Sequence, residues 1–235
     1  MSDAADIVDI ADIAARLNAV RERIARACER AHRKAAAVRL VLASKTQTPQ
    51  TIAAAYAAGA RDFGENYVKE AIVKRAALGH LSGVRWHMIG HLQSNKARVA
   101  VEHFDLVHTL DGVRLASALA RAHPAPPMPV LIEVKLGDEA SKSGASPNMA
   151  AALIESVRAM VEVRGLMTIP PPAENPATAR RWFAGLRELR DRLAAESGLA
   201  LGELSMGMSE DYEVAIEEGA TIVRVGRAVF GERPG

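Results

Sequence analysis

The sequence predicts an α/β protein, a single-domain (β/α)8 barrel of the TIM type with an extra helix at its N-terminus. The first observation is that eight strand-like segments alternate with helix-like segments along the chain. The second is the length of 235 residues, because such barrels need about 250. The third is that no Gly-x-Gly-x-x-Gly motif follows the first strand, which weakens the rival, a doubly wound open sheet. We expect one domain over residues 1–235, with the helix in 1–35 and the barrel in 36–235.

The N-terminal helix is predicted by an apolar stripe whose members recur every three or four residues. Aspartates crowd the start of this segment and arginines its end, a distribution that suits the helix dipole. The stripe could pack on the barrel or on another subunit, and the sequence leaves both partners open. Its members are Ile7, Ile10, Ile13, Leu17, Val20 and Ile24.

The strands are predicted where short apolar runs end at a turn or a polar residue. The first run, 38–44, is rich in β-branched and aliphatic residues, as buried parallel strands are. The eight predicted strands are 38–44, 62–66, 85–90, 106–111, 129–136, 161–169, 203–208 and 221–226.

Helices are predicted between these strands, and the longest has the clearest boundaries. Asn175 is a good N-cap, Pro176 suits the first helical position, and Gly198 follows the last apolar residue of the stripe. Thr48 and Pro49 begin the first helix after the opening strand in the same way. The predicted helices are 49–58, 67–78, 94–102, 112–122, 147–159, 176–197 and 210–218.

The composition is that of an ordinary globular protein without a strongly charged face. The net charge is +2, from 30 basic and 28 acidic side chains, so nothing favours binding to nucleic acid or a membrane surface. The single cysteine, Cys28, cannot form an intramolecular disulfide and fits a reducing compartment. No apolar run reaches the roughly 18 residues of a membrane helix, and the start lacks a secretory signal. We expect a cytoplasmic protein that binds neither nucleic acid nor membrane.

Lys45 is the most informative residue, because it directly follows the first buried strand. An ammonium group at such a position loses hydration, which is costly. One use for it is an amine kept partly neutral, ready to form a Schiff base with a carbonyl. The alternative is a strand-end lysine that reaches water or pairs with a carboxylate. Position alone leaves both interpretations open.

The ends of the seventh and eighth strands together resemble a phosphate cradle. Ser209 lies where a strand gives way to a helix, and Gly226 offers backbone that an anion can approach closely. The alternative is a capping serine and a packing glycine. Arg224 alternates with Val223 and Val225, so it faces the barrel interior if the valines face the helices. Its partner would then be a ligand or a structural ion pair.

Other polar residues are weaker candidates. His87 and His91 are four residues apart, but on a strand and the loop after it, so we expect no metal site. Lys142 lies in a flexible, Ser- and Gly-containing loop, where it is either a solvated lysine or a second amine near the barrel mouth. Cys28 is expected to serve packing.

Several motifs in order along the chain resemble one family. They resemble the barrel that binds pyridoxal 5′-phosphate (PLP) in alanine racemase and its relatives, the fold-type III group, and more closely the PLP homeostasis proteins. The resemblance covers about residues 38 to 231, nearly the whole chain. The matching stretches are 43–46, 63–67, 86–96, 141–144, 165–170, 204–209, 224–226 and 230–231.

The resemblance implies roles for particular residues. Lys45 would hold the cofactor, PLP, as a Schiff base, and Arg224 would hydrogen-bond the pyridine nitrogen. Ser209, Gly226 and the backbone N–H of Arg227 would hold the phosphate. The remaining candidates would wall the ring, and they are Asn66, His87 and Met167.

The resemblance implies a carrier of PLP more than an enzyme. Alanine racemase adds a second domain with a tyrosine that acts as the second acid/base, whereas this sequence ends at Gly235. An arginine beside the ring nitrogen cannot give it a proton, so the ring is a poorer electron sink. We expect no catalytic residues and a monomer that buffers PLP, with PLP-dependent apoenzymes as partners and Lys142 as a transit amine. The alternatives are a small PLP-dependent amino-acid racemase, a class I aldolase-type barrel and a purely structural role.

Overall fold

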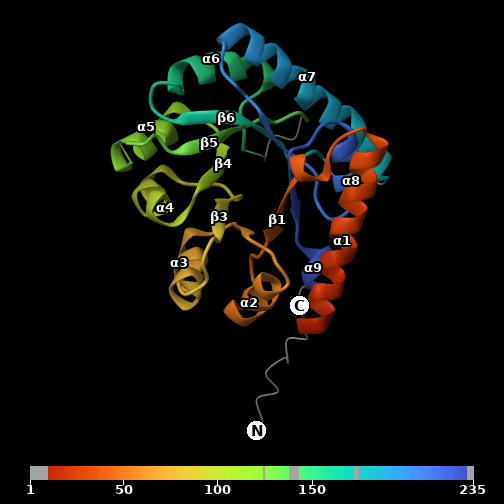
Figure 1. Cartoon of the computed structure of the whole chain (residues 1–235). Helices are drawn as coiled ribbons and strands as arrows, with labels where there is room; N and C mark the ends of the chain where they lie inside the picture. Colours follow the sequence, from red (N-terminus) through yellow and green to blue (C-terminus); the bar gives the residue numbers. More distant parts are fainter. Residues whose placement is uncertain (1–9, 124, 138–142, 172–174, 232–235) are drawn as a thin grey trace.

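The computed structural model describes residues 10–123, 125–137, 143–171 and 175–231, and it confirms the predicted barrel. Eight parallel strands close in chain order, with β1 paired to both β2 and β8 and the helices on the outside (Figure 1). The strands are β1 (Arg39–Ala43), β2 (Asp62–Glu65), β3 (Arg85–Met88), β4 (Leu106–Leu110), β5 (Pro129–Glu133), β6 (Glu162–Met167), β7 (Glu203–Ser205) and β8 (Ile222–Val225).

Each predicted strand is present, and each ends one to three residues earlier than predicted. The seventh shows why, because the backbone turns at Gly207, whose φ is 90°. A Cβ on that glycine would lie 2.6 Å from the Cβ of Ala215, so only glycine allows this turn beneath the following helix. The residues after each strand therefore form loops at the carboxyl end of the barrel.

The predicted helices are also present, two of them entered through a short 3-10 turn. Residues 94–96 and 176–179 form these turns (η2, Ser94–Lys96, and η3, Pro176–Ala179). A third turn, η1 (Ala35–Ala37), precedes β1. The α-helices are α1 (Ile10–Arg30), α2 (Pro49–Ala57), α3 (Val68–Leu78), α4 (Ala97–His103), α5 (Val113–Ala122), α6 (Pro147–Val157), α7 (Arg180–Ser197), α8 (Tyr212–Glu217) and α9 (Arg227–Phe230).

The predicted caps hold the ends of these helices. The Thr48 hydroxyl accepts a hydrogen bond from the backbone N–H of Thr51, and Pro49 begins α2. The Asn175 side chain accepts from the N–H of Ala177 at the start of η3, ahead of α7. Gly198 ends α7 in the left-handed conformation, with φ 69°.

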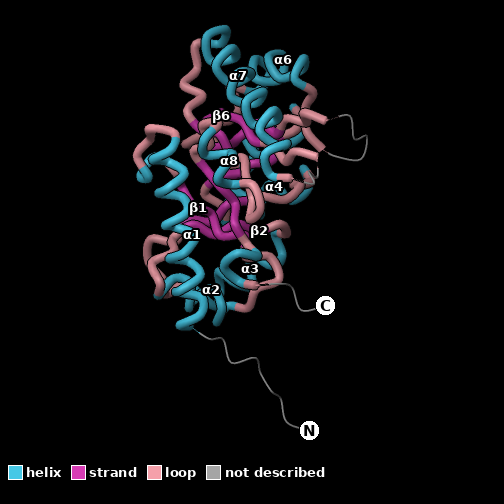
Figure 2. The backbone as a smooth tube through the Cα atoms, turned by 90° about the vertical axis from the view of Figure 1, so that its right-hand side faces the viewer, coloured by secondary structure: helices cyan, strands magenta, loops and turns pink. Residues whose placement is uncertain are grey.

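Helix α1 packs on the outside of the barrel (Figures 1 and 2), where it lies beside α8 and α9 (Figure 1). Its stripe is buried from Ile13 onward, whereas Ile10 is 58% exposed and Ile7 lies outside the described residues. Ion pairs add to this contact, because Arg23 reaches Glu213 at 2.6 Å and Arg30 reaches Glu217 at 2.8 Å. The sequence left open whether the apolar stripe packs on the barrel or on another subunit, and in the structure it packs on the barrel.

The barrel has two apolar layers, as alternation along the strands requires. One lies between strands and helices and includes Val223 and Val225. The other is a small inner cluster, which leaves room inside the barrel for polar side chains. The inner cluster consists of Val41, Leu106, Leu131, Met167 and Ile222.

The helices of the described segments are too short or too polar to cross a membrane. Cys28 is buried in α1 among apolar residues, and burial raises the pKa of its thiol. A buried thiol with a raised pKa is poorly nucleophilic, which fits the packing role expected for it.

Candidate functional site

One cavity at the carboxyl end of the barrel brings together most of the predicted site. It has a volume of about 590 Å³ and lies among the ends of β1, β7 and β8. Five of the eight candidate residues line it: Lys45, Ser209, Arg224, Gly226 and Arg227. These residues lie up to 182 positions apart in the chain (227 − 45), and the closed barrel makes them neighbours. This is the end of the barrel where such folds carry their sites.

Lys45 is half-buried and directly follows β1. The next residue, Thr46, has a φ of 68°, which is strained for a β-branched side chain. Its backbone N–H donates to Oε2 of Glu70, 3.1 Å away on α3. The backbone on the carboxyl side of Lys45 is therefore held in an unusual conformation by a charged acceptor.

A buried ion pair holds the backbone on the amino side of Lys45. Nζ of Lys74 lies 2.8 Å from both carboxylate oxygens of Glu65 and donates to the backbone oxygen of Ser44, also at 2.8 Å. The Ser44 hydroxyl donates to Oε1 of Glu65 at 2.6 Å. Burial raises the pKa of the Glu65 carboxyl, and the bonds from Lys74 and Ser44 oppose that rise.

Lys74 is a residue that the sequence reasoning missed. Its side chain is only 6% exposed, although it belongs to a helix that also carries an exposed lysine, Lys69. The spacing of Lys74 could have indicated its burial and its pairing. It lies four residues after Glu70, on the face of α3 that also carries the buried Ala71 and Leu78.

Ser209 and Gly226, the residues of the predicted phosphate cradle, meet at the start of α9. The Ser209 hydroxyl accepts hydrogen bonds from the backbone N–H of Gly226 at 3.3 Å and of Ala228 at 3.4 Å. Ser209 therefore does not cap α8, as the alternative interpretation proposed. The backbone N–H groups already converge on an oxygen, which is the arrangement that an anion uses at a helix start.

Gly226 is required for the close approach of this turn to β1. A Cβ at this position would lie 3.1 Å from the backbone oxygen of Ala43. A side chain would therefore require a small shift of the turn or of Ala43. Both interpretations of Gly226, packing and anion approach, are thus compatible with its geometry.

The two carboxylates next to Ser209 are directed to other partners. Asp211 accepts a hydrogen bond from the backbone N–H of Met208 at 2.7 Å, and burial raises the pKa of its carboxyl. Glu210 forms an ion pair with Arg227 on the rim of the cavity. The carboxylates are therefore engaged by donors of the loop itself, which reduces their repulsion of an anion.

Arg224 points into the barrel, as the alternation of β8 predicts, and is only 4% exposed. Its Nη1 donates to the Ser205 hydroxyl at 2.5 Å, and its Nη2 donates to the backbone oxygen of Thr168 at 2.9 Å. Burial lowers the pKa of Arg224 to about 10, and the nearby Asp211 and Glu133 carboxylates counteract that shift. The guanidinium stays charged at neutral pH, held by a hydroxyl and a carbonyl.

The three predicted ring-wall residues lie apart from the cavity lining. His87 is 1% exposed, with Nε2 2.9 Å from Asp62 and Nδ1 3.0 Å from His108. Met167 is fully buried in the inner apolar cluster. Alternation along β3 and β6 turns these two side chains into the barrel interior, and their place at a ring wall stays a prediction.

Asn66 is half-buried at the end of β2, where its backbone faces Gly90. A Cβ on Gly90 would lie 2.5 Å from the backbone oxygen of Asn66, so this approach requires glycine. Asn66 is not among the residues that line the cavity. Its place at a ring wall stays a prediction.

Two further candidates concern the rim of the barrel. Lys142 lies outside the described residues, so its role as a second amine stays a hypothesis. His91 lies 3.5 Å from Asp111 on the loops after β3 and β4. Within the described segments, no group of three or more His, Cys, Asp or Glu side chains could hold a metal ion.

Known proteins resemble this chain over nearly its whole length. The family model described as alanine racemase, N-terminal domain, matches residues 8–234. A PLP homeostasis protein of Pseudomonas aeruginosa is 45% identical over 225 residues, which are 94% of this chain and 96% of that protein. The chain belongs to the alanine racemase N-terminal domain family. A second PLP homeostasis protein, of Aquifex aeolicus, is 47% identical over 222 residues, 93% of this chain and 97% of the relative.

Solved structures of the family extend this likeness to three dimensions. PipY of Synechococcus elongatus, in a structure with PLP bound, is 40% identical with a TM-score of 0.83. The comparison covers 93% of this chain and 100% of PipY. This family member therefore shares the fold of a protein whose structure contains PLP.

Proposed function

We propose that this family member is a PLP homeostasis protein, which binds the cofactor through Lys45 and carries or buffers it without strong catalytic turnover. The observation that carries the proposal is a single cavity that combines an amine, an anion cradle and a buried guanidinium. An aldehyde with a phosphate and a ring nitrogen offers one partner to each of these groups. The names of the curated relatives and the PLP bound in PipY support the same ligand.

The residues that would hold PLP are those that line the cavity. Lys45 would present its amine to the aldehyde, and the start of α9, with Ser209, Gly226 and Arg227, would receive the phosphate. Arg224 would face the ring nitrogen from inside the barrel. When bound, PLP supplies an aldehyde that condenses reversibly with amines, which is the chemistry needed to capture it and to release it.

Arg224 supports a carrier more than an enzyme. A guanidinium only donates hydrogen bonds and stays protonated, so it cannot transfer a proton to the ring nitrogen. Its partners, the Ser205 hydroxyl and the Thr168 carbonyl, leave its charge without direct neutralisation. A ring nitrogen that stays unprotonated withdraws electrons weakly, which disfavours reactions through a carbanion. The site is therefore suited to holding PLP and poorly suited to racemisation.

The partners proposed are PLP-dependent apoenzymes, and the site of action is the cytoplasm. We propose a monomer, because the apolar stripe of α1, which could have bound a second copy, is used on the barrel. The single, buried Cys28 agrees with a reducing compartment.

The test is spectroscopic and compares the wild type with Lys45→Ala, using Lys96→Ala as a matched control. Lys96 is exposed and outside the cavity. Added PLP is expected to give a new visible absorption band in the wild type and in Lys96→Ala, and reduction with borohydride should attach the cofactor to Lys45. The proposal fails if Lys45→Ala shows the same band and the same reduced adduct.

A second measurement separates a carrier from an enzyme. The PLP-loaded protein is incubated with L-alanine in deuterated water, and exchange at the α-carbon is followed. A carrier is expected to show no exchange above that of free PLP. Exchange that exceeds free PLP and is lost in Lys45→Ala would overturn the carrier proposal in favour of a small racemase.

A further inference from the structure

A column of buried polar side chains crosses the interior of the barrel. It begins at Arg224, whose guanidinium lines the cavity, and ends at Asp62, at the opposite mouth of the barrel. All five side chains are polar and could form hydrogen bonds with water, yet none of them is more than 6% exposed. The members come from five strands and are Arg224 (β8), Ser205 (β7), His108 (β4), His87 (β3) and Asp62 (β2).

The column is continuous at hydrogen-bond distances. Nη1 of Arg224 lies 2.5 Å from the Ser205 hydroxyl oxygen, which lies 2.8 Å from Nδ1 of His108. Nε2 of His108 lies 3.0 Å from Nδ1 of His87. Nε2 of His87 lies 2.9 Å from Oδ1 of Asp62.

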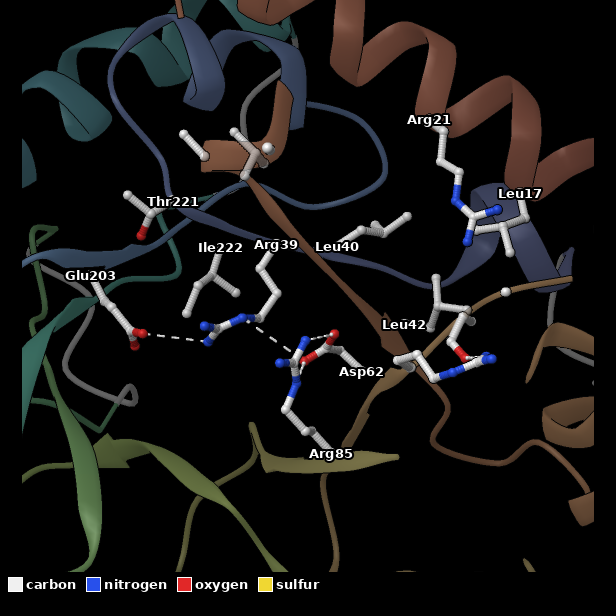
Figure 3. Close-up of a pocket in the computed structure, with 16 residues that line it drawn as sticks. Leu17, Arg21, Arg39, Leu40, Leu42, Asp62, Arg85, Glu203, Thr221 and Ile222 are labelled. Carbon is white, nitrogen blue, oxygen red and sulfur yellow. Dashed lines mark hydrogen bonds and ion pairs between the residues drawn. The ribbon is translucent and has the colours of Figure 1, made fainter. Parts of the chain in front are cut away.

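The far end of the column is anchored by arginines at the amino-terminal mouth of the barrel. Arg85 binds both oxygens of Asp62 at 2.7 Å, and Nε of Arg39 lies 3.9 Å from Oδ1 (Figure 3). These residues line a second cavity of about 500 Å³ beneath α1. Burial alone would raise the pKa of the Asp62 carboxyl, but the hydrogen bonds from His87 and Arg85 lower it to about 2. The carboxylate is therefore kept ionised.

The chemistry of the two ends favours one direction for every bond in the column. Arg224 can only donate, so the Ser205 oxygen accepts from it and the Ser205 hydrogen is left for Nδ1 of His108. His108 then carries its hydrogen on Nε2 and donates to Nδ1 of His87. His87 carries its hydrogen on Nε2 and donates to Asp62. In this arrangement each hydrogen finds an acceptor, and each imidazole carries a single ring hydrogen.

The reverse direction is less favourable. It requires a doubly protonated His87 that donates to His108, and a His108 that donates through Nδ1 to Ser205. The Ser205 oxygen would then receive two donors, and its own hydrogen would have no acceptor among the partners found for it. It would also place a further charge inside the barrel, where an unpaired donor and a charge are both costly.

We infer that Ser205, His108 and His87 are positioning residues, which hold the Arg224 guanidinium at the cavity through a chain of hydrogen bonds that runs one way to Asp62. The part of this inference that concerns PLP rests on the proposed function, because only a bound ring gives Arg224 a ligand to face. The hydrogen-bonded column itself exists without the ligand. It ties the orientation of one cavity residue to a carboxylate at the other end of the barrel.

The first test examines the hydrogen bonds of the column alone and needs no cofactor. Heteronuclear NMR of the protein labelled on its histidine nitrogens reports which ring nitrogen carries the hydrogen. The expected result at neutral pH is that His87 and His108 are both neutral with the hydrogen on Nε2. A doubly protonated His87 together with a His108 protonated on Nδ1 would overturn the inference. His80, which is exposed on the surface, serves as the reference histidine.

The second test asks whether the chain positions Arg224 for PLP. Ser205→Ala removes the link, and Ser205→Thr retains a hydroxyl. Thr109→Val is the control, because it removes a buried hydroxyl that bonds to the Gly90 carbonyl at 2.7 Å, outside the chain. Ser205→Ala is expected to weaken PLP binding roughly tenfold or more, since it leaves a charged donor short of an acceptor. It should also shift the absorption band of bound PLP, with Ser205→Thr closer to the wild type.

The outcomes separate the two claims. Equal affinities and identical spectra for Ser205→Ala, Thr109→Val and the wild type would refute the positioning role while leaving PLP binding intact. A wild type that binds no PLP would refute the proposed function and the PLP part of the inference, and the NMR result would still decide the chain. Thermal unfolding of each variant identifies any loss of affinity that follows from a loss of the fold.

Discussion

Replacing Lys74 by methionine is expected to destabilise the protein strongly, although the residue lies on an outer helix. The carboxylate of Glu65 is fully buried, and Nζ of Lys74 contacts both of its oxygens at 2.8 Å. Methionine keeps most of the volume and removes the charge. Breaking a buried pair by removing one partner costs about 3–5 kcal/mol, because a charge is left without compensation.

The assay is urea unfolding at neutral pH, with the free energy extrapolated to water and the denaturant slope compared between variants. Lys69→Met, an exposed lysine on the same helix, is the matched control and should cost less than about 1 kcal/mol. The double variant Glu65→Gln/Lys74→Met is expected to recover part of the loss, because no charge is then buried. A Lys74→Met variant that is no less stable than Lys69→Met would refute the reasoning.

The same variant is expected to weaken the capture of PLP. Lys74 donates to the backbone oxygen of Ser44, and Glu70 accepts from the N–H of Thr46, so both neighbours of Lys45 depend on this cluster. Loosening them lets the strained backbone at Thr46 relax, and Lys45 shifts with it. Affinity for PLP, measured by absorbance under conditions where the variant is folded, should fall in Lys74→Met and stay unchanged in Lys69→Met.

The remaining predictions concern pH and packing. Burial lowers the pKa of His108 well below 6.5, so below that pH the unfolded chain binds a proton that the folded chain does not. Stability should therefore fall by about 1.4 kcal/mol per pH unit on acidification below 6.5, and His108→Asn, but not His80→Asn, should lose this slope in urea unfolding. The pKa of Asp62 is lowered from 3.8 to about 2, so its contribution is present above pH 3.8 and is lost as the pH falls through 2. Asp62→Asn should remove about 2 kcal/mol of stability at neutral pH, and a loss that is equal at pH 7 and at pH 2 would contradict this account. Gly165→Ala should prevent folding or cost several kcal/mol, because a Cβ there would lie 1.8 Å from the backbone oxygen of Glu203. Gly185→Ala, where a Cβ meets nothing, is its control, and soluble yield with thermal unfolding compares the two.

The fold could be predicted because its signals are local. Each strand has its own apolar run and each helix its own stripe, and caps such as Thr48 and Asn175 act within three residues of themselves. The site residues were sought at the carboxyl ends of the strands, because all parallel strands of a barrel present these ends on one side. This search located the cavity-lining residues Lys45, Ser209, Arg224, Gly226 and Arg227. What was predicted well depended on sequence periodicity and chain direction alone.

The contacts that sequence reasoning did not anticipate concern side chains inside the barrel. His87 and Met167 were expected at the cavity wall, yet both point into the interior, where His87 meets Asp62 and His108. Such contacts depend on the stagger between strands, which decides the height at which each inward side chain stands. No single strand contains that information.

The sequence by itself determined the order of the elements, the burial of the first strand and the residues at the strand ends. These follow from period-two and period-3.6 patterns and from capping, which act over a few residues. Only the tertiary structure decided that α1 covers its own barrel, that Lys74 pairs with Glu65 beside Lys45, and that five strands line up a polar chain from Arg224 to Asp62. The physical reason is closure: joining β8 to β1 sets one register for all eight strands at once, and that register determines which distant side chains meet.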